Sequence, residues 1–165
     1  MNPPDNAPVL VAVAAVQQKQ TNIAEAKEPI TLMIDAVNAA MKDSQAPTIA
    51  KKIEHICVPK GMWQYTNPAA LIAEAVGAEN AVTEFCDFGI LQQTNLGQAC
   101  QKIAAGDIEV ALVVGGEAKY RQLQAMIQNV EVSETQQHDS QPDSFLQPEA
   151  ELWSEIESKA GLGMP

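Results

Sequence analysis

Residues 80–118 decide the expected fold of this chain, and they read NAVTEFCDFGILQQTNLGQACQKIAAGDIEVALVVGGEA. The run 80–85 favours a strand, and the run 91–105 has a helical pattern that ends before Gly106. A second strand-like run, 109–114, follows and stops at a pair of glycines. A strand, a helix and a strand in this order predict a right-handed crossover between two parallel strands.

The preceding residues repeat the same alternation. A valine-rich apolar run, 8–16, predicts a strand buried on both faces. Apolar side chains at three-to-four spacing predict a helix over 29–43, and a second helix is expected over 67–76. A strand is expected between them at 53–58. The chain is therefore predicted to adopt an α/β fold, a three-layer unit with a mainly parallel sheet covered by helices.

The chain is expected to divide near residue 118. Residues 1–118 hold the alternating elements and form the predicted βαβαβαβ unit. Residues 119–165 are predicted to form an acidic loop or linker segment with one or two short helices. The stretch 131–157 carries eight carboxylates and no lysine or arginine, which is typical of a solvated segment.

Composition excludes several classes of function. The net charge is −11 and Arg121 is the only arginine, so neither nucleic acid nor an anionic membrane surface is an expected partner. The apolar run 8–16 is too short to span a bilayer, and the first five residues carry no basic charge typical of a signal peptide. A cytoplasmic location is expected.

The three cysteines, Cys57, Cys86 and Cys100, lie far apart in the sequence and form no CxxC pair. Neither a disulfide framework nor a metal site is therefore expected from their spacing.

The order and spacing of these elements resemble the N-terminal half of the thiolase superfamily. The resemblance covers residues 8–118 well and 145–165 weakly, and it includes the ending AAGDIEVALVVGGEA. The stretch WQYTNP at 63–68, followed by LIAE at 71–74, is similar to a branch of thiolase-like acetyl-CoA acetyltransferases. That branch also tends to lack the active-site cysteine.

The resemblance implies that the chain is the N-terminal half, or a fragment, of a larger thiolase-like protein. Each half in that family is a five-stranded layered unit, and a loop domain after the fourth strand covers the acyl-CoA. The family's acid–base histidine and second cysteine would lie in an absent second half. The implied substrate is acyl-CoA or CoA, with no permanently bound cofactor. The implied partner is a second copy or a missing C-terminal half, paired through the strand at 80–85.

The family's nucleophile position, counted back from Gly106, falls on Gly89. Cys86 lies three residues earlier and is the one candidate catalytic residue, since it follows a strand and precedes a helix. Its neighbour Asp87 opposes activation of a thiol, and a buried structural cysteine is the alternative role for Cys86.

Three functions remain open. The first is a catalytically degenerate thiolase-like unit. The second is an acyl-CoA acyltransferase that uses Cys86 and is completed by another chain. The third is a non-enzymatic interaction module that uses the acidic segment.

The other residues that could carry chemistry are expected to be structural. Cys57 and Cys100 are predicted to pack in the core, with Cys100 on a helix whose Leu96 and Ile103 face inward. His55 is expected to be structural or exposed, and His138 lies in the acidic segment without an assigned role.

Two loops allow a ligand-binding interpretation. Gly115-Gly116 follows a strand but lacks the GxGxxG and GxxxxGK[ST] patterns, so a dinucleotide-binding fold is the weaker alternative. These glycines are instead expected to permit a tight turn with positive φ. The aromatic pair Trp63 and Tyr65 is expected to make a satellite hydrophobic contact beneath its loop.

Overall fold

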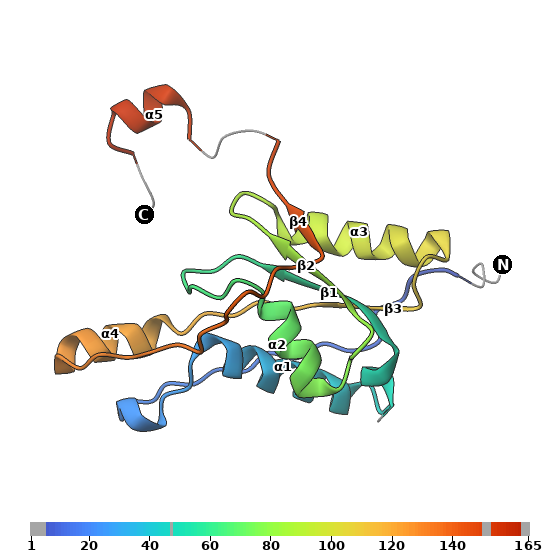
Figure 1. Cartoon of the computed structure of the whole chain (residues 1–165), viewed down its shortest axis with the longest axis horizontal. Helices are drawn as coiled ribbons and strands as arrows, with labels where there is room; N and C mark the ends of the chain where they lie inside the picture. The colour runs from blue at the N-terminus through green and yellow to red at the C-terminus, as the bar shows by residue number, and fades with distance from the viewer. Residues whose placement is uncertain (1–5, 47, 150–152, 163–165) are drawn as a thin grey trace.

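A computed structural model describes residues 6–46, 48–149 and 153–162, and it contains a four-stranded sheet between helices (Figure 1). The strands in chain order are β1 (Ile53–Pro59), β2 (Val82–Cys86), β3 (Val110–Val113) and β4 (Ser144–Leu146). Their order in the sheet is β3-β1-β2-β4, and each neighbouring pair is parallel. The predicted α/β fold with a parallel sheet is confirmed.

The helices complete the layers. Helices α1 and α2 lie on one face of the sheet, and α3 lies on the other (Figure 1). Among the described residues, no helix has the length and apolar character needed to cross a membrane. The seven helical elements described are η1 (Ile23–Glu25), α1 (Pro29–Asp43), η2 (Ile49–Lys52), α2 (Pro68–Val76), α3 (Gln92–Ala105), α4 (Lys119–Gln128) and α5 (Glu155–Lys159).

Local sequence signals fix the ends of these helices. The Asn67 side chain accepts a hydrogen bond from the Ala70 backbone N–H and so caps α2 at its start. Gly77 ends α2 and Gly106 ends α3, both with left-handed backbone. Because these signals are local, the sequence predicts the helix boundaries closely.

The main hydrophobic core lies between the sheet and the pair α1 and α2. Side chains of alternate strand residues, among them Ile56, Val58 and Phe85, pack there against Met33 of α1 and Ile72 of α2. Trp63 and Tyr65, expected to make a satellite contact, belong to this core. The Trp63 indole N–H donates to the Gly116 carbonyl at 3.0 Å, and the Tyr65 hydroxyl donates to Glu28 at 2.9 Å. Hydrogen bonding thus lets both polar aromatics be buried.

The predicted strand at 8–16 is wrong. Within the described part of the chain, these residues join no strand ladder, and Val9 and Leu10 are 73% and 78% exposed. Both edges of β1 are taken by β2 and β3, so the run cannot pair with β1. It lies beside β3 instead, where it lines a cavity and forms no ladder with that strand.

The strand β4 comes from the acidic segment, where the sequence predicts only loop and helix. The Asp143 carboxylate accepts hydrogen bonds from the Thr83 backbone N–H at 2.8 Å and from its hydroxyl at 2.7 Å. The strand that follows pairs with Glu84–Cys86 of β2. Further along the segment, Thr135 donates to Glu28 through its backbone N–H and its hydroxyl. Specific polar contacts therefore hold this segment against β2 and against the start of α1.

The predicted role of Gly115 and Gly116 is also wrong, because neither has positive φ. Both lie where another side chain comes close to the backbone. A Cβ atom on Gly116 would lie 2.9 Å from the Met33 Cγ, and one on Gly115 would lie 3.0 Å from the Pro59 Cγ. The glycines therefore allow β3 and the following chain to approach α1 and β1.

We expect Gly116→Ala to lower the free energy of unfolding by about 1–3 kcal/mol, because the added methyl group must displace the buried Met33 side chain. The matched control is Gly97→Ala in α3, where an added Cβ meets nothing within 4 Å. That change is expected to stabilise the chain by up to about 1 kcal/mol through helix propensity. Urea denaturation measures both, and an unchanged stability of Gly116→Ala would contradict the close approach.

Candidate functional site

The face of the sheet beneath α3 is polar. Residues two apart in a strand share a face, so His55 and Cys57 of β1 point toward α3, as do Glu84 and Cys86 of β2. From α3, Lys102 reaches across to His55 and Glu84. These five residues, His55, Cys57, Glu84, Cys86 and Lys102, are called the polar cluster below.

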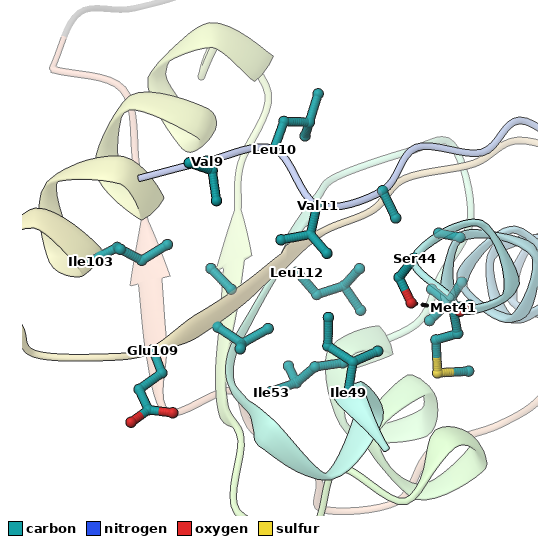
Figure 2. Close-up of a pocket in the computed structure, with 15 residues that line it drawn as sticks. Val9, Leu10, Val11, Met41, Ser44, Ile49, Ile53, Ile103, Glu109 and Leu112 are labelled. Atoms are coloured by element: carbon teal, nitrogen blue, oxygen red, sulfur yellow. Dashed lines mark hydrogen bonds between the residues drawn. The ribbon is translucent and has the colours of Figure 1, made fainter. Parts of the chain in front are cut away.

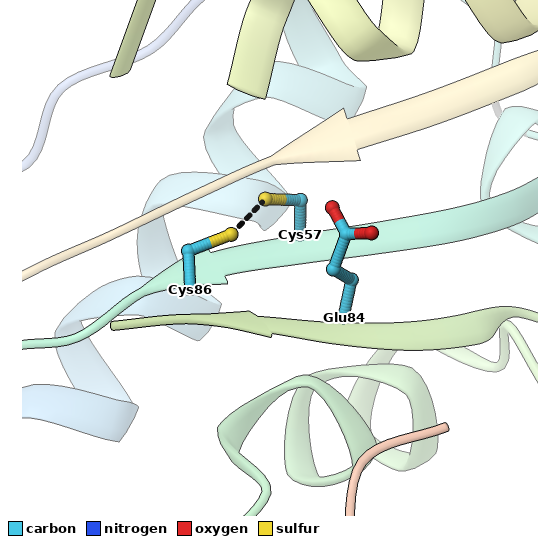
Figure 3. A group of neighbouring side chains, drawn as sticks. All are labelled: Cys57, Glu84 and Cys86. Carbon is cyan, nitrogen blue, oxygen red and sulfur yellow. Dashed lines mark hydrogen bonds between the residues drawn. The ribbon is translucent and has the colours of Figure 1, made fainter. Parts of the chain in front are cut away.

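The two cysteines occupy the centre of this face. Cys57 and Cys86 are both fully buried free thiols, and their sulfurs lie 3.3 Å apart (Figure 3). Cys57 is the register partner of Glu84, which places the carboxylate beside the sulfur pair. Parallel pairing thus joins two cysteines that are 29 residues apart in the chain.

The Glu84 side chain is a buried anion with three polar neighbours. The His55 Nε2 and the Lys102 Nζ each lie 3.6 Å from its Oε2, and the Ser144 hydroxyl donates to the same oxygen at 2.9 Å. Although burial raises the pKa of Glu84, His55 leads these neighbours in lowering that pKa to about 2. The carboxylate is therefore ionised at neutral pH and is compensated by the Lys102 ammonium.

The thiol pair is polarised. The hydrogen bond with Cys86, burial and the nearby Glu84 charge all raise the pKa of the Cys57 thiol. The same contact lowers the pKa of the Cys86 thiol. The two thiols therefore titrate as a pair and not as independent groups.

The polar cluster has unused hydrogen-bonding capacity. Among the described residues, the His55 Nδ1 and the Glu84 Oε1 are buried and have no hydrogen-bond partner. The same holds for both side-chain polar atoms of Asn95, an α3 residue that is 1% exposed. Buried polar atoms are rarely left unpaired, so this layer beneath α3 has donors and acceptors that a ligand could use.

The candidate nucleophile does not lie where acyl transfer needs it. Cys86 is 0% exposed and lies against Cys57, and α3 covers this face. Gly89, at the family's nucleophile position, lies in an exposed turn with φ of 95°. The structure therefore brings Cys86 into a buried cluster and leaves a residue without a side chain at the exposed position.

The other predicted residues have mixed outcomes. Cys57 is buried, as predicted, and His55 is a structural residue at 2% exposure. His138 is exposed and lies outside the polar cluster.

The predicted core position of Cys100 is wrong, because Cys100 is exposed and Leu96 is 45% exposed. Helix α3 instead turns Asn95, Ala99 and Lys102 toward the sheet. Lys102 contacts buried polar residues of the sheet. The face of α3 that packs against the sheet is therefore not the most apolar face of this helix.

One signal for the polar cluster was present in the sequence. Each central strand carries a polar residue and a cysteine two positions apart, His55-x-Cys57 and Glu84-x-Cys86. Alternation assigns each pair to a single face, while Ile56, Val58 and Phe85 take the other. The sequence alone does not show that these two strands are neighbours. Their pairing in the sheet brings the four residues together.

A second feature is an apolar cavity of about 160 Å³ beside β3 (Figure 2). The N-terminal segment, defined as residues 7–18, forms one wall through Val9, Leu10 and Val11. The other walls come from α1, β3 and the Ile103 side chain of α3. The cavity marks incomplete packing between this segment and the edge of the sheet.

We expect the free energy of unfolding to fall as the pH drops from about 4.3 toward 2. Glu84 has a lowered pKa in the folded chain, so its stabilising contribution is present above the unfolded pKa and is lost through this range. The contribution is about 3 kcal/mol. Urea denaturation at a series of pH values measures it.

The variant Glu84→Gln is expected to flatten this pH dependence. The exposed Glu131→Gln is the matched control and should keep the wild-type slope. Equal slopes for all three proteins would contradict the assigned role of Glu84.

A scan against protein-family models, a search of curated proteins and a search of solved structures each find no match to this chain. The resemblance to the thiolase superfamily therefore stays a prediction from the sequence.

Proposed function

We propose that this chain is a thiolase-like N-terminal half that is catalytically degenerate on its own and acts by binding another protein chain. The observation that carries the proposal is the position of Cys86, which is fully buried against Cys57. Gly89, where the resemblance places the nucleophile, offers no side chain for catalysis.

Acyl transfer to a thiol has two physical requirements that Cys86 does not meet. The sulfur must come within about 3–3.5 Å of the thioester carbonyl, and a reactive thiolate needs electropositive, partly exposed surroundings. Cys86 is fully buried on the face of the sheet toward α3 and lies beside the buried Glu84 carboxylate (Figure 3). An acyltransferase acting through Cys86 would therefore need α3 to leave the sheet, which makes it the weaker proposal.

The edge formed by β3 and the N-terminal segment is the better surface for a partner chain. In the described residues, β3 pairs with one strand only, β1, and no charged side chain occurs in residues 7–18. An exposed apolar edge favours association. The valines and leucine of this segment are its exposed apolar residues: Val9, Leu10, Val11, Val13 and Val16.

We assign a second copy of this chain as the partner at that edge. Two copies with a charge of −11 repel each other, so a contact between them must be made through an uncharged surface, and the N-terminal segment is one. Pairing through the strand at 80–85, the arrangement implied by the family resemblance, is less accessible, because β4 already occupies the edge of β2 over Glu84–Cys86.

Incubation of the purified chain with short acyl-CoA thioesters is expected to leave Cys86 unmodified, because its sulfur is buried. Intact-mass spectrometry with peptide mapping provides the measurement. Cys100→Ser is the control that removes the exposed thiol, where nonspecific acylation would occur. A single adduct that maps to Cys86 and disappears in Cys86→Ala would replace this proposal with an acyltransferase.

Sedimentation velocity tests the partner. Wild-type protein is expected to form dimers, and the double variant Val11→Asp, Val13→Asp is expected to weaken dimerisation by at least about tenfold by placing charges on the contact. Ile156→Asp changes a residue that is 80% exposed on α5 and should dimerise like wild type. A wild-type chain that stays monomeric at every concentration would contradict the assignment.

A further inference from the structure

The centre of the polar cluster holds three donors suited to a metal ion. One ligand atom from each of Cys57, Glu84 and Cys86 lies within 4.8 Å of the other two, and all three residues are buried (Figure 3). We propose that these three side chains bind a divalent metal ion, and that Zn²⁺ is the ion this donor set selects. This inference goes beyond the proposed function, since a degenerate thiolase-like half would not need a metal ion at these residues.

The sulfur positions fit a shared metal ion. Two thiolates on one tetrahedral Zn²⁺, each about 2.3 Å from the metal, have sulfurs about 3.8 Å apart. The observed separation of Cys57 and Cys86 is 3.3 Å, so binding requires a small outward movement of the two side chains. The pairing of β1 with β2 already holds the backbones of both cysteines in place, so little of the chain has to become ordered when a metal ion binds.

The third ligand atom is free to bind. The Oε2 of Glu84 accepts the Ser144 hydroxyl and faces His55 and Lys102, whereas the Oε1 has no hydrogen-bond partner among the described residues. A metal ion can therefore take the Oε1 without breaking a hydrogen bond. The His55 Nε2 lies 3.6 Å from the Glu84 Oε2 and 2.8 Å from the Lys102 Nζ, on the side of the carboxylate that the Oε2 faces.

The charges balance in both states. Without metal, two neutral thiols lie beside the ion pair of Glu84 and Lys102. With metal, the two thiols lose their protons to solvent, and the sulfurs bind the divalent ion together with the carboxylate. The resulting site carries one net negative charge, which the Lys102 ammonium compensates. A buried site requires such compensation. Thiolates favour Zn²⁺ over hard divalent ions, and carboxylate oxygen is also a ligand that Zn²⁺ accepts.

The test uses the full chain, reduced and freed of metal, and titrated with Co²⁺ in the absence of oxygen. We expect one equivalent to bind and to produce a thiolate-to-cobalt charge-transfer absorption, which an equivalent of Zn²⁺ then removes. Binding is expected to release about two protons per metal ion in weakly buffered solution, and to tighten as the pH rises.

Variants identify the ligands. Cys57→Ala and Cys86→Ala are expected to abolish the charge-transfer absorption, and Glu84→Gln to weaken Co²⁺ binding by at least about tenfold. Cys100→Ser is the matched control and should bind like wild type, because Cys100 is exposed and outside the polar cluster. Circular dichroism establishes that each variant is folded.

A second readout on the wild-type chain covers the case in which a core variant does not fold. Zn²⁺ is expected to raise the thermal midpoint of unfolding and, in mild denaturant, to protect Cys57 and Cys86 but not Cys100 from alkylation. The proposal is overturned if the folded, reduced wild-type chain shows no charge-transfer absorption. It is also overturned if the absorption persists in Cys57→Ala and Cys86→Ala, or if it requires Cys100.

Discussion

The parallel pairing of β1 with β2 is the constraint on which the rest of the structure depends. Its register sets Cys57 beside Glu84 and Val58 beside Phe85, so neighbouring positions send their side chains to opposite faces. One face becomes the hydrophobic core under α1 and α2, and the other becomes the polar cluster under α3. A shift of the register by one residue would bury Glu84 among the apolar residues of the core and move Phe85 against Lys102.

The two faces make unequal contributions to stability. Burial of apolar side chains such as Ile56, Met33 and Ile72 on the α1 and α2 face drives folding. The α3 face contains a buried ion pair, whose attraction is offset by the cost of removing both charges from water, and several unpaired polar atoms, which oppose folding. A chain selected for stability alone would place apolar residues there. A metal ion bound as proposed above would use part of this unpaired capacity.

The parts of the structure that the sequence predicts are those with local causes. Helix α1 follows from apolar spacing and Pro29, and α2 follows from the Asn67 cap and Gly77. The run 8–16 was predicted wrongly because a valine-rich pattern indicates an extended chain but does not state which sheet edge is free. The strand β4 has only three residues, and its pairing depends on Thr83 and Asp143, which are far apart in the chain. The polar cluster has the same nonlocal origin, since neither strand alone brings two sulfurs together.

The burial of Cys86 connects the two proposals physically. A thiol that serves as an acyl acceptor must be accessible to the thioester, must not be in contact with a second thiol, and must lie close to positive charge. Cys86 instead lies 3.3 Å from the Cys57 sulfur, fully buried and beside a carboxylate. The second thiol and the carboxylate that oppose nucleophilic attack are the groups that a divalent cation requires, because the cation's charge reverses the local electrostatics and favours deprotonation of both sulfurs. The same three side chains thus disfavour acyl transfer at this position and favour metal binding.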